Sequence, residues 1–293
     1  MSEQETRIHV VINPVAGKNE PIINTINDVF NQYGIDWGIS VTRKFGDATE
    51  FARQAAEDGF DVVAGYGGDG TQHEIANGII GTGALMGVLP GGTGNGFANE
   101  LGTPTKLRPA LELLCTNHKV RHVDVVQMNE GYFIQRLYVG IEPEEQTSRE
   151  SKDKYGTFAY AIDSFHRAQH RKEARYKVII DGEQYDEMAM KLYVVNAAKA
   201  GTGISITGNI SKIDDGLVDV FILDGENLKS LSGAVDRMLH LDTKNARDWM
   251  RQGKEVFIDT DPDQPVWTDG EYTGRTPVSL KVLPAALPVI VPD

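Results

Sequence analysis

Residues 60–71 read Phe-Asp-Val-Val-Ala-Gly-Tyr-Gly-Gly-Asp-Gly-Thr, a short apolar run that ends in a cluster of glycines. Such an apolar run is typical of a buried parallel strand. Apolar residues recur at helical spacing after Thr71, so the glycine cluster is predicted to be a strand-to-helix turn. Glycines let a backbone come close to a bulky anion, and the start of a helix offers unpaired N–H groups. The stretch therefore predicts a phosphate-binding turn.

Asp69 is the unusual residue of this turn. A carboxylate repels a neighbouring phosphate unless it holds a metal ion or orients a proton donor. We therefore expect a nucleotide-phosphate site with a metal ion beside it. A glycine-rich turn without a ligand needs only positive φ angles. That alternative leaves unexplained Asp69, Thr71 and a second Gly-Gly-Thr sequence at residues 91–93.

The first half of the chain alternates strands with helices, which predicts a doubly wound α/β domain with a mostly parallel sheet. Asn13–Lys18 follows the first strand, at the sheet edge where such proteins bind ligands. This segment lacks the spacing of a Walker P-loop. The loop 90–97 opens a further helix, whose N-terminus is expected to face the same phosphates. The predicted strands are 7–12, 36–42, 60–65 and 84–89, and the predicted helices include 21–33 and 47–58.

The second half is predicted to be a β-rich domain, an antiparallel sandwich. We place the nucleotide-binding domain at residues 1–122 and the β-rich acceptor domain at 123–293, with its last residues free to pack back on the first domain. The active-site cleft is expected between the two domains. The predicted strands are 120–128, 132–141, 176–180, 191–196, 216–223, 255–259, 266–269 and 278–283, and the predicted helices are 158–171 and 228–240.

Two acidic stretches lie in this second half. If residues 266–271 form one strand, Asp269 and Glu271 project to the same face and can share a metal ion and a proton. A hairpin turn with solvated acids fits the same stretch equally well, because Asp-Gly is a turn signal. Residues 213–219 suit either an oxygen-rich cation site or a loop between strands, and the sequence alone favours the loop.

Composition narrows the class of partners. The chain carries 42 acidic and 29 basic residues, a formal net charge of −13, which argues against general nucleic-acid binding. The basic stretch 166–177 is either a contact with anionic lipid headgroups or a solvated helix end, and we favour the helix end. Cys115 is the only cysteine, and no apolar run reaches the roughly 20 residues of a membrane span. We expect a cytoplasmic protein with at most peripheral membrane contact.

Several segments, taken in order, resemble those of the diacylglycerol-kinase-type lipid kinases. This family includes bacterial diacylglycerol and phosphatidylglycerol kinases and the sphingosine and ceramide kinases. The resemblance covers nearly the whole chain. Gly-Gly-Asp-Gly-Thr alone is shared with NAD kinases and phosphofructokinases, whereas the segments together are specific. They are Asn13–Lys18, Gly67–Thr71, Leu89–Asn95, Asp215–Leu217 and Asp269–Glu271.

The resemblance implies ATP- and Mg²⁺-dependent phosphoryl transfer to a lipid hydroxyl at a membrane surface, with diacylglycerol as the default acceptor. Glu271 would be the catalytic base, with Asp269 beside it and Asp69 helping to place Mg²⁺. A structural Mg²⁺ would be held by Asp215 with backbone oxygens of Lys212 and Leu217. The residues implied to line the nucleotide are Asn13, Pro14, Gly17, Lys18, Thr42, Gly67, Gly68, Asp69, Gly70, Thr71, Glu74, Gly92, Thr93 and Asn95.

The chain departs from the family pattern at three places. Gly96 stands where bacterial members usually carry Asp, His73 replaces a frequent Asn, and residues 140–142 read Gly-Ile-Glu instead of Gly-Phe-Asp. These departures leave two alternatives: a non-catalytic nucleotide or lipid sensor, or a kinase acting on a sphingoid base, phosphatidylglycerol or NAD. The retained Asp69, Asp269 and Glu271 argue against the sensor. The acceptor lipid and the oligomeric state, a homodimer included, are left open by the sequence.

Overall fold

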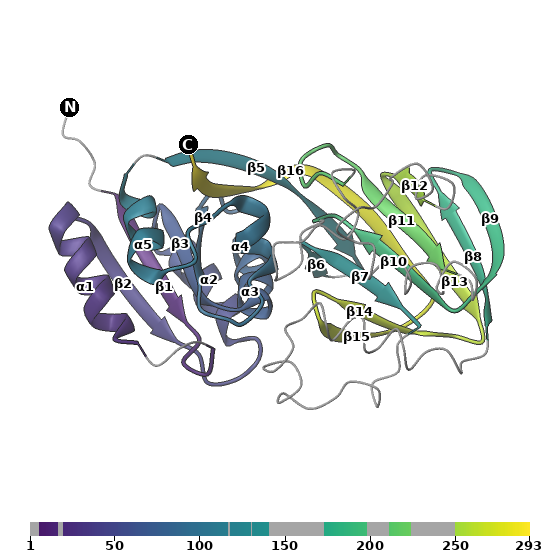
Figure 1. Cartoon of the computed structure of the whole chain (residues 1–293), viewed down its shortest axis with the longest axis horizontal. Coiled ribbons are helices and arrows are strands. Elements are labelled where there is room, and N and C mark those ends of the chain that lie inside the picture. The colour runs from purple at the N-terminus through teal and green to yellow at the C-terminus, as the bar shows by residue number, and fades with distance from the viewer. Residues whose placement is uncertain are drawn as a thin grey trace, which may run out of the picture. The chain divides into compact units, whose positions relative to one another are not determined.

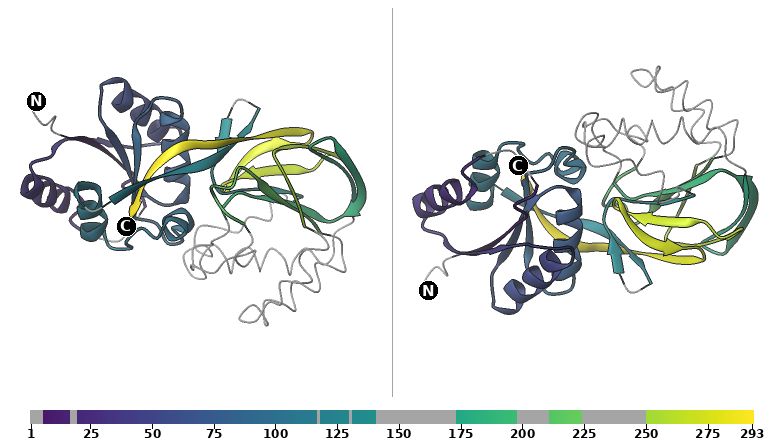
Figure 2. Two further views of the ribbon diagram at one scale, coloured as in Figure 1. Left: turned by 90° about the horizontal axis from the view of Figure 1, so that it is seen from above. Right: turned by 90° about the horizontal axis from the view of Figure 1, so that it is seen from below.

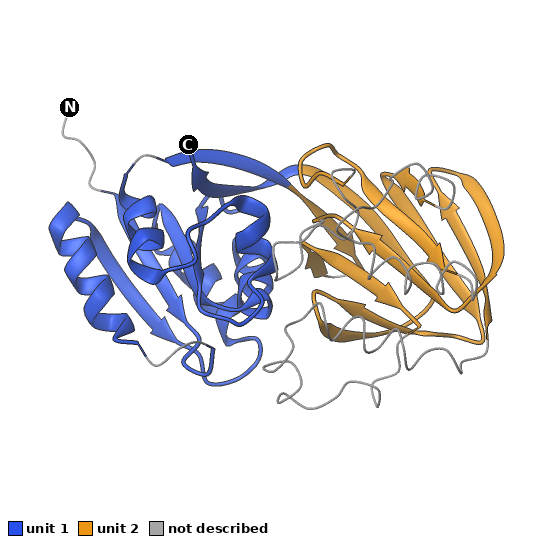
Figure 3. Ribbon diagram, in the orientation of Figure 1, with its two compact units in different colours: residues 1–123, 199–203, 285–293 blue, residues 124–198, 204–284 orange. Residues whose placement is uncertain are grey.

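The computed structural model describes residues 6–16, 20–116, 118–129, 131–140, 173–197, 211–223 and 250–293 (Figure 1). Its described residues form two compact units (Figure 3). Unit 1 contains those up to Val123 together with Ala285–Asp293, and unit 2 contains those from Asp124 to Pro284. Strands β5 (His118–Met128) and β16 (Val278–Pro292) each contribute residues to both units.

Unit 1 is an α/β domain with a parallel sheet, as predicted. Its strands lie in the order β2-β1-β3-β4, and the end of β16 pairs with β4 in parallel. Helices α1 and α5 cover one face of the sheet, and α2 and α3 cover the other (Figure 2). The elements are β1 (Arg7–Ile12), α1 (Ile22–Tyr33), β2 (Asp36–Val41), α2 (Asp47–Glu57), β3 (Val62–Gly67), α3 (Asp69–Ile79), β4 (Leu85–Pro90), α4 (Gly96–Leu101) and α5 (Leu107–Cys115).

The central position of β3 explains its sequence. All six residues of β3 are buried, because both faces of this strand are covered by helices and both of its edges are paired. Helix α1 turns Ile26, Val29 and Phe30 toward the same core, at the spacing that brings one helix face inward. The packed core holds the carboxyl ends of β1, β3 and β4 at one edge of the sheet.

Unit 2 is an antiparallel β sandwich, again as predicted. One sheet has the order β16-β13-β8-β9, with β5 paired to β16 and β6 to β5, and the other has the order β12-β11-β10-β7-β14-β15. Alternate residues of β8 are buried, which is the pattern of a strand with one face in the core. The remaining elements are β6 (Gly131–Phe133), β7 (Arg136–Val139), β8 (Ala174–Ile180), β9 (Glu183–Ala189), β10 (Lys191–Val195), β11 (Val218–Leu223), β12 (Met250–Gly253), β13 (Glu255–Asp261), β14 (Pro265–Thr268) and β15 (Glu271–Arg275).

Some boundaries differ from the prediction. The expected strand 132–141 is two strands, because Ile134 and Gln135 between them bond to other residues instead of a strand ladder. Strand β9 is mostly exposed and polar, so its sequence carried no apolar signal. Strand β16 continues to Pro292, well beyond the predicted end at residue 283. The predicted helices 158–171 and 228–240 lie outside the described residues.

The basic stretch 166–177 ends in a strand. Arg175 and Lys177 lie on β8, and Lys177 falls within the predicted strand 176–180, so the interpretation of the basic stretch as a helix end does not hold for these two residues. Arg175 donates to both carboxylate oxygens of Asp186, at 2.7 and 2.6 Å, and its charge is therefore matched within the sheet. Residues 166–172 lie outside the described part of the chain.

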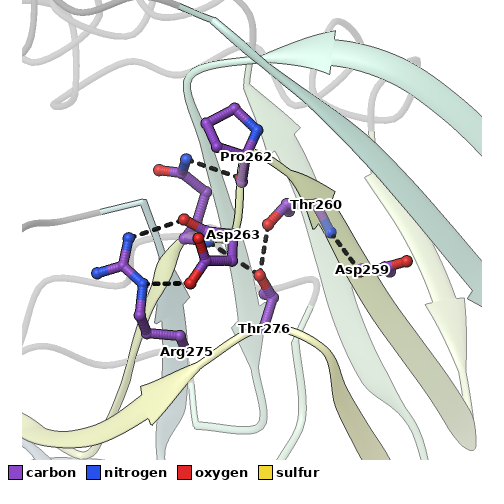
Figure 4. A network of polar contacts seen from close by, with 7 residues as sticks. Asp259, Thr260, Pro262, Asp263, Arg275 and Thr276 are labelled. Atoms are coloured by element: carbon purple, nitrogen blue, oxygen red, sulfur yellow. Dashed lines mark hydrogen bonds and ion pairs between the residues drawn. The ribbon is translucent and has the colours of Figure 1, made fainter.

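A polar network joins the end of β13 to the outer end of the β14–β15 hairpin (Figure 4). The Thr260 and Thr276 hydroxyls bond to each other, and the Gln264 backbone N–H donates to Thr276 Oγ1 at 2.9 Å. Arg275 Nε donates to Asp263 Oδ2 at 2.7 Å. These contacts fix the end of the hairpin that is opposite to its turn.

Candidate active site

Three loops meet where β1, β3 and β4 end. Asn13 lies just after β1, and its side-chain Nδ2 donates to Thr71 Oγ1 at 3.1 Å. Its backbone N–H donates to the Tyr66 carbonyl at 2.9 Å, and the Gly91 N–H donates to the Gly67 carbonyl at 2.9 Å. The structure therefore brings together the first three nucleotide motifs that the sequence indicated.

The two glycine-rich loops approach too closely for side chains. Between the loops, a Cβ on Gly92 would lie 2.5 Å from the Gly68 Cα. Within the first loop, a Cβ on Gly67 would lie 2.3 Å from Thr71 Oγ1. Asn95 shapes the second loop by accepting from the Gly92 N–H at 2.9 Å and donating to the Gly92 carbonyl at 2.6 Å. Side-chain-free backbone beside the start of α3 suits a phosphate chain.

A cavity borders the second loop. It has a volume of about 800 Å³ and is lined by Pro90–Asn95, by Thr105–Pro109 at the start of α5, and by Glu20. Thr93, which is exposed, lies on its wall. A cavity of this size can hold a nucleotide-sized ligand, and the glycine backbone on its wall suits the phosphates of ATP.

Thr42 lies beside the first loop. It is buried at the end of β2, and its backbone N–H donates to the Ile12 carbonyl at 2.9 Å. Pro14 is exposed in the loop that follows β1. Gly17 and Lys18, which were also predicted to line the nucleotide, lie outside the described residues.

Asp69 makes contacts that the sequence did not predict. Its Oδ2 accepts from the Gly96 N–H at 3.0 Å and its Oδ1 accepts from the Phe97 N–H at 2.9 Å. Both oxygens thus bind the start of α4, where unpaired N–H groups favour a negative charge. Gly96, one of the three departures from the family pattern, contributes its backbone N–H to this contact. Asp69 couples the two glycine-rich loops, and its role toward Mg²⁺ stays a prediction.

Glu74 joins two helices. Its Oε2 accepts from the Gly46 and Ala48 N–H groups at 2.9 and 3.1 Å, at the start of α2, and Thr49 Oγ1 donates to its backbone carbonyl at 2.9 Å. Burial raises the pKa of Glu74, and these N–H donors oppose that rise. The carboxylate therefore ties α3 to α2, and its predicted contact with a nucleotide stays a prediction.

The raised pKa of Glu74 predicts a pH-dependent stability. A carboxyl whose pKa is higher in the folded state binds more protons there, so the free energy of unfolding falls as pH rises from the unfolded-state pKa through the raised pKa. Glu74→Gln removes this titration. Urea unfolding at a series of pH values that rises from about 4, near the ordinary pKa of a glutamate, is expected to show the wild type losing stability relative to the variant. Parallel stability curves would contradict the prediction.

In unit 2, Asp269 and Gly270 form the turn between β14 and β15. Both have positive φ angles, 48° and 94°, which is typical of a tight two-residue hairpin turn. Asp269 is therefore not in a strand, and the prediction that it shares a strand face with Glu271 is wrong. The alternative, a hairpin turn at Asp-Gly, is confirmed, although only Glu271 is solvated and Asp269 is buried.

The Asp269 carboxylate is bound by backbone N–H groups. It accepts from Ile134 at 2.8 Å and from Gln135 and Arg136 at 2.9 Å each. Glu271 begins β15 and is exposed. The hypothesis of two carboxylates that share a proton is therefore replaced by a buried Asp269 that anchors the turn and an accessible Glu271 beside it.

The loop 212–217 has the chemistry of an oxygen-rich cation site. Asp124 Oδ2 accepts from the Gly216 N–H at 2.6 Å, and Asp215 Oδ1 accepts from the Leu217 N–H at 3.1 Å. Burial raises the pKa of Asp215, and the charges of Asp124 and Asp214 raise it further. A bound cation would offset this crowding of carboxylates.

Within the described ranges, no group of three or more His, Cys, Asp or Glu side chains is arranged to hold a metal ion. A cation at this loop would therefore depend on backbone carbonyls, as the predicted set of Asp215, Lys212 and Leu217 does. The donors fit Mg²⁺ in type, because this ion prefers oxygen ligands. Asp124 was missed from the sequence, where the only signal was an acid inside the apolar run Val123–Val126.

Models of known protein families match the sequences of both units. The model of the diacylglycerol kinase catalytic domain matches residues 7–128, and that of the YegS C-terminal NAD kinase beta sandwich-like domain matches residues 136–291. The chain belongs to the diacylglycerol-kinase-type lipid kinase family. As a family member it is a lipid kinase, an enzyme that transfers a phosphoryl group from ATP to a lipid hydroxyl.

Individual family members match along their full length. A diacylglycerol kinase of Staphylococcus saprophyticus is 29% identical over 297 residues, which cover 98% of this chain and 96% of that protein. A diacylglycerol kinase of Staphylococcus aureus is likewise 29% identical, with coverage of 98% and 93%. The crystal structure of a diacylglycerol kinase from Bacillus anthracis superposes with a TM-score of 0.82 at 26% identity, covering 97% of this chain and 96% of that one.

Proposed function

We propose that this lipid kinase phosphorylates diacylglycerol, with ATP as donor, Mg²⁺ as the metal ion and Glu271 as the general base. The observation that supports it is that unit 1 has side-chain-free glycine loops and unit 2 has an accessible glutamate on a hairpin held by hydrogen bonds. The relatives named diacylglycerol kinase match nearly the entire chain, which supports this acceptor.

The glycine-rich loops and Glu271 have different roles in the proposed reaction. The loops at Asn13, Gly67–Thr71 and Gly92–Asn95 hold the phosphate chain of ATP through backbone N–H groups. The Glu271 carboxylate accepts the proton of the lipid hydroxyl while the hydroxyl oxygen bonds to the γ-phosphorus and the bond to ADP breaks. A proton leaves the lipid, the phosphoryl group joins it, and ADP is released. The acceptor is a membrane lipid, so the enzyme works by peripheral contact with a lipid surface.

Mg²⁺ enters this proposal at two places. Bound with ATP, it would neutralise charge on the transferring phosphoryl group. A structural ion would be held by Asp215 and the carbonyls of Lys212 and Leu217, where it would stabilise the loop that Asp124 also binds.

Among the helices that the structure describes, none has the length and apolar character needed to cross a membrane.

Removal of Mg²⁺ tests the structural site. We expect Mg²⁺ to raise the Tm of the wild type above its value in EDTA, because an ion that binds only the folded state stabilises that state by mass action. Asp215→Asn should show almost no such rise. Asp186→Asn, at an exposed carboxylate of the same unit that pairs with Arg175, should respond as the wild type does. Equal Tm shifts in the wild type and Asp215→Asn would contradict the site.

An acceptor panel tests the proposed substrate. Purified protein is incubated with γ-labelled ATP, Mg²⁺ and mixed micelles that carry diacylglycerol, monoacylglycerol, phosphatidylglycerol or sphingosine at equal mole fraction, and soluble NAD⁺ is a fifth arm. We expect the highest kcat/KM with diacylglycerol. A higher value with another acceptor would overturn the substrate. ATP binding without any labelled product would overturn the proposal in favour of a sensor.

A further inference from the structure

Asn196 is a buried residue that no nucleotide or lipid motif explains. It follows β10 and has no exposed surface. Its Nδ2 donates to the Ile134 carbonyl at 2.8 Å and to the Asp124 carbonyl at 3.0 Å, and its backbone N–H donates to the Gln135 carbonyl at 2.8 Å. Both hydrogens of the side-chain amide are therefore used to hold backbone of other strands.

The same short segment is held by Asp269. The Asp269 carboxylate accepts from the N–H groups of Ile134, Gln135 and Arg136. In return, the Asp269 N–H donates to the Arg136 carbonyl at 2.9 Å. Residues 134–136 thus give N–H groups to Asp269 and carbonyl groups to Asn196 and Asp269, which explains why β6 and β7 are separate strands. We call Asn196, Ile134–Arg136 and Asp269 the hairpin clamp.

The hairpin clamp acts on the turn that precedes Glu271. Asp269 lies two residues before Glu271, and Thr268 pairs with Glu271 across the turn. The outer end of the same hairpin is fixed separately by the Thr276 and Arg275 contacts (Figure 4). Because hydrogen bonds hold both ends of the hairpin, they also hold the backbone of Glu271, although its side chain is exposed. A general base must reach its proton within about 2.6–3.2 Å, so this position matters for the reaction.

We propose that Asn196 and Asp269 are positioning residues for Glu271, which they place through the Ile134–Arg136 segment. This inference rests on the proposed role of Glu271 as the general base. Neither residue needs to touch the substrate. Misplacement of a catalytic group by about 1 Å costs up to 10²-fold in rate, so loss of the clamp lowers kcat even in protein that remains folded.

Asn196→Asp is the sharpest test, because it keeps the size of the side chain and replaces the NH2 group, the source of both donors, by an oxygen that faces two carbonyl oxygens. We expect kcat for lipid phosphorylation to fall about 10- to 100-fold, with the KM for ATP changed by less than about twofold. Combining it with Glu271→Gln should lower kcat no further than Glu271→Gln alone, because both changes remove one function. A double variant that loses the full product of the two single losses would overturn the proposal.

Amide hydrogen exchange provides a readout that does not depend on activity. In Asn196→Asp, peptides covering residues 131–139 and 265–275 should exchange faster than in the wild type, because the clamp holds these amides. Unchanged exchange would overturn the clamp, and faster exchange with wild-type kcat would overturn its positioning role. If the wild type phosphorylates no lipid, the proposed function fails, and the exchange result still decides whether the clamp exists.

Two further variants keep the test decisive. Asp269→Asn retains one carbonyl oxygen for the Gln135 and Arg136 N–H groups and is the second test if Asn196→Asp does not fold. Tyr176→Phe is the matched control, because it removes another buried polar contact of unit 2, the hydrogen bond that the Tyr176 hydroxyl donates to the Met190 carbonyl, and leaves both ends of the Glu271 hairpin unchanged. The control should lower the Tm while kcat and exchange at residues 131–139 stay at wild-type values. A fall in kcat for Tyr176→Phe equal to that for Asp269→Asn would overturn the positioning role.

Discussion

Glu271→Gln is expected to lower kcat for lipid phosphorylation by about 10²- to 10⁴-fold, the usual contribution of a general base. The amide has nearly the same size and cannot accept the hydroxyl proton. Because Glu271 is exposed at the start of β15 and belongs to unit 2, the change should leave both folding and the ATP loops of unit 1 intact. Initial rates with saturating ATP and lipid measure kcat, and calorimetric titration measures ATP affinity.

Glu255→Gln is the matched control for this prediction. Glu255 is also an exposed glutamate at the first position of a strand of unit 2, where its ion pair with Lys281 is solvent-exposed. Such a surface pair contributes little to stability, so this variant should keep the wild-type kcat. A Glu271→Gln protein that retains at least about a tenth of the wild-type kcat would contradict the assignment of the base.

Gly92→Ala is expected to abolish most ATP binding. The added Cβ would lie 2.5 Å from the Gly68 Cα, and neither atom belongs to a flexible side chain that can move away. The two glycine-rich loops must therefore separate, which removes N–H groups from the phosphate site. We expect the dissociation constant for ATP to rise at least about tenfold and the free energy of unfolding to fall by about 1–3 kcal/mol.

Gly87→Ala separates the loss of affinity from the loss of stability. A Cβ on Gly87 would lie 2.8 Å from the Ala64 Cβ and 3.0 Å from a methyl carbon of Leu114, inside the core of unit 1 and away from the loops. This variant should be destabilised as well, yet bind ATP with the affinity of the wild type at a temperature where it is folded. Equal affinity losses in Gly92→Ala and Gly87→Ala would contradict the role assigned to the loops.

The architecture was predictable because it rests on periodicity. The apolar run that becomes β3 is buried on both faces, and the glycines after it allow a contact that no other residue permits. The alternation of strands with helices in the first half then implies a parallel sheet. Strand β9 was missed because an exposed edge strand has no apolar stripe to detect.

The carboxylates were harder to assign from sequence. For Asp269 the sequence left two alternatives open, a strand face shared with Glu271 and a hairpin turn. Its backbone φ of 48° belongs to the turn, and its carboxylate binds N–H groups more than 130 residues earlier in the chain. Asp69 was expected to help place a metal ion, a role that stays a prediction, and the N–H donors that it binds at the start of α4 were not predicted. Sequence spacing describes local neighbours only, so partners that come from other elements remain invisible to it.

Transfer of label from γ-labelled ATP to diacylglycerol in mixed micelles is the most direct test of the proposed reaction. Wild type, Gly92→Ala and Glu271→Gln are assayed side by side, with ATP affinity measured on each protein. We predict labelled lipid from the wild type and little from either variant. Glu271→Gln should bind ATP with normal affinity, whereas Gly92→Ala should not. A wild type that binds ATP and labels no diacylglycerol would contradict the account.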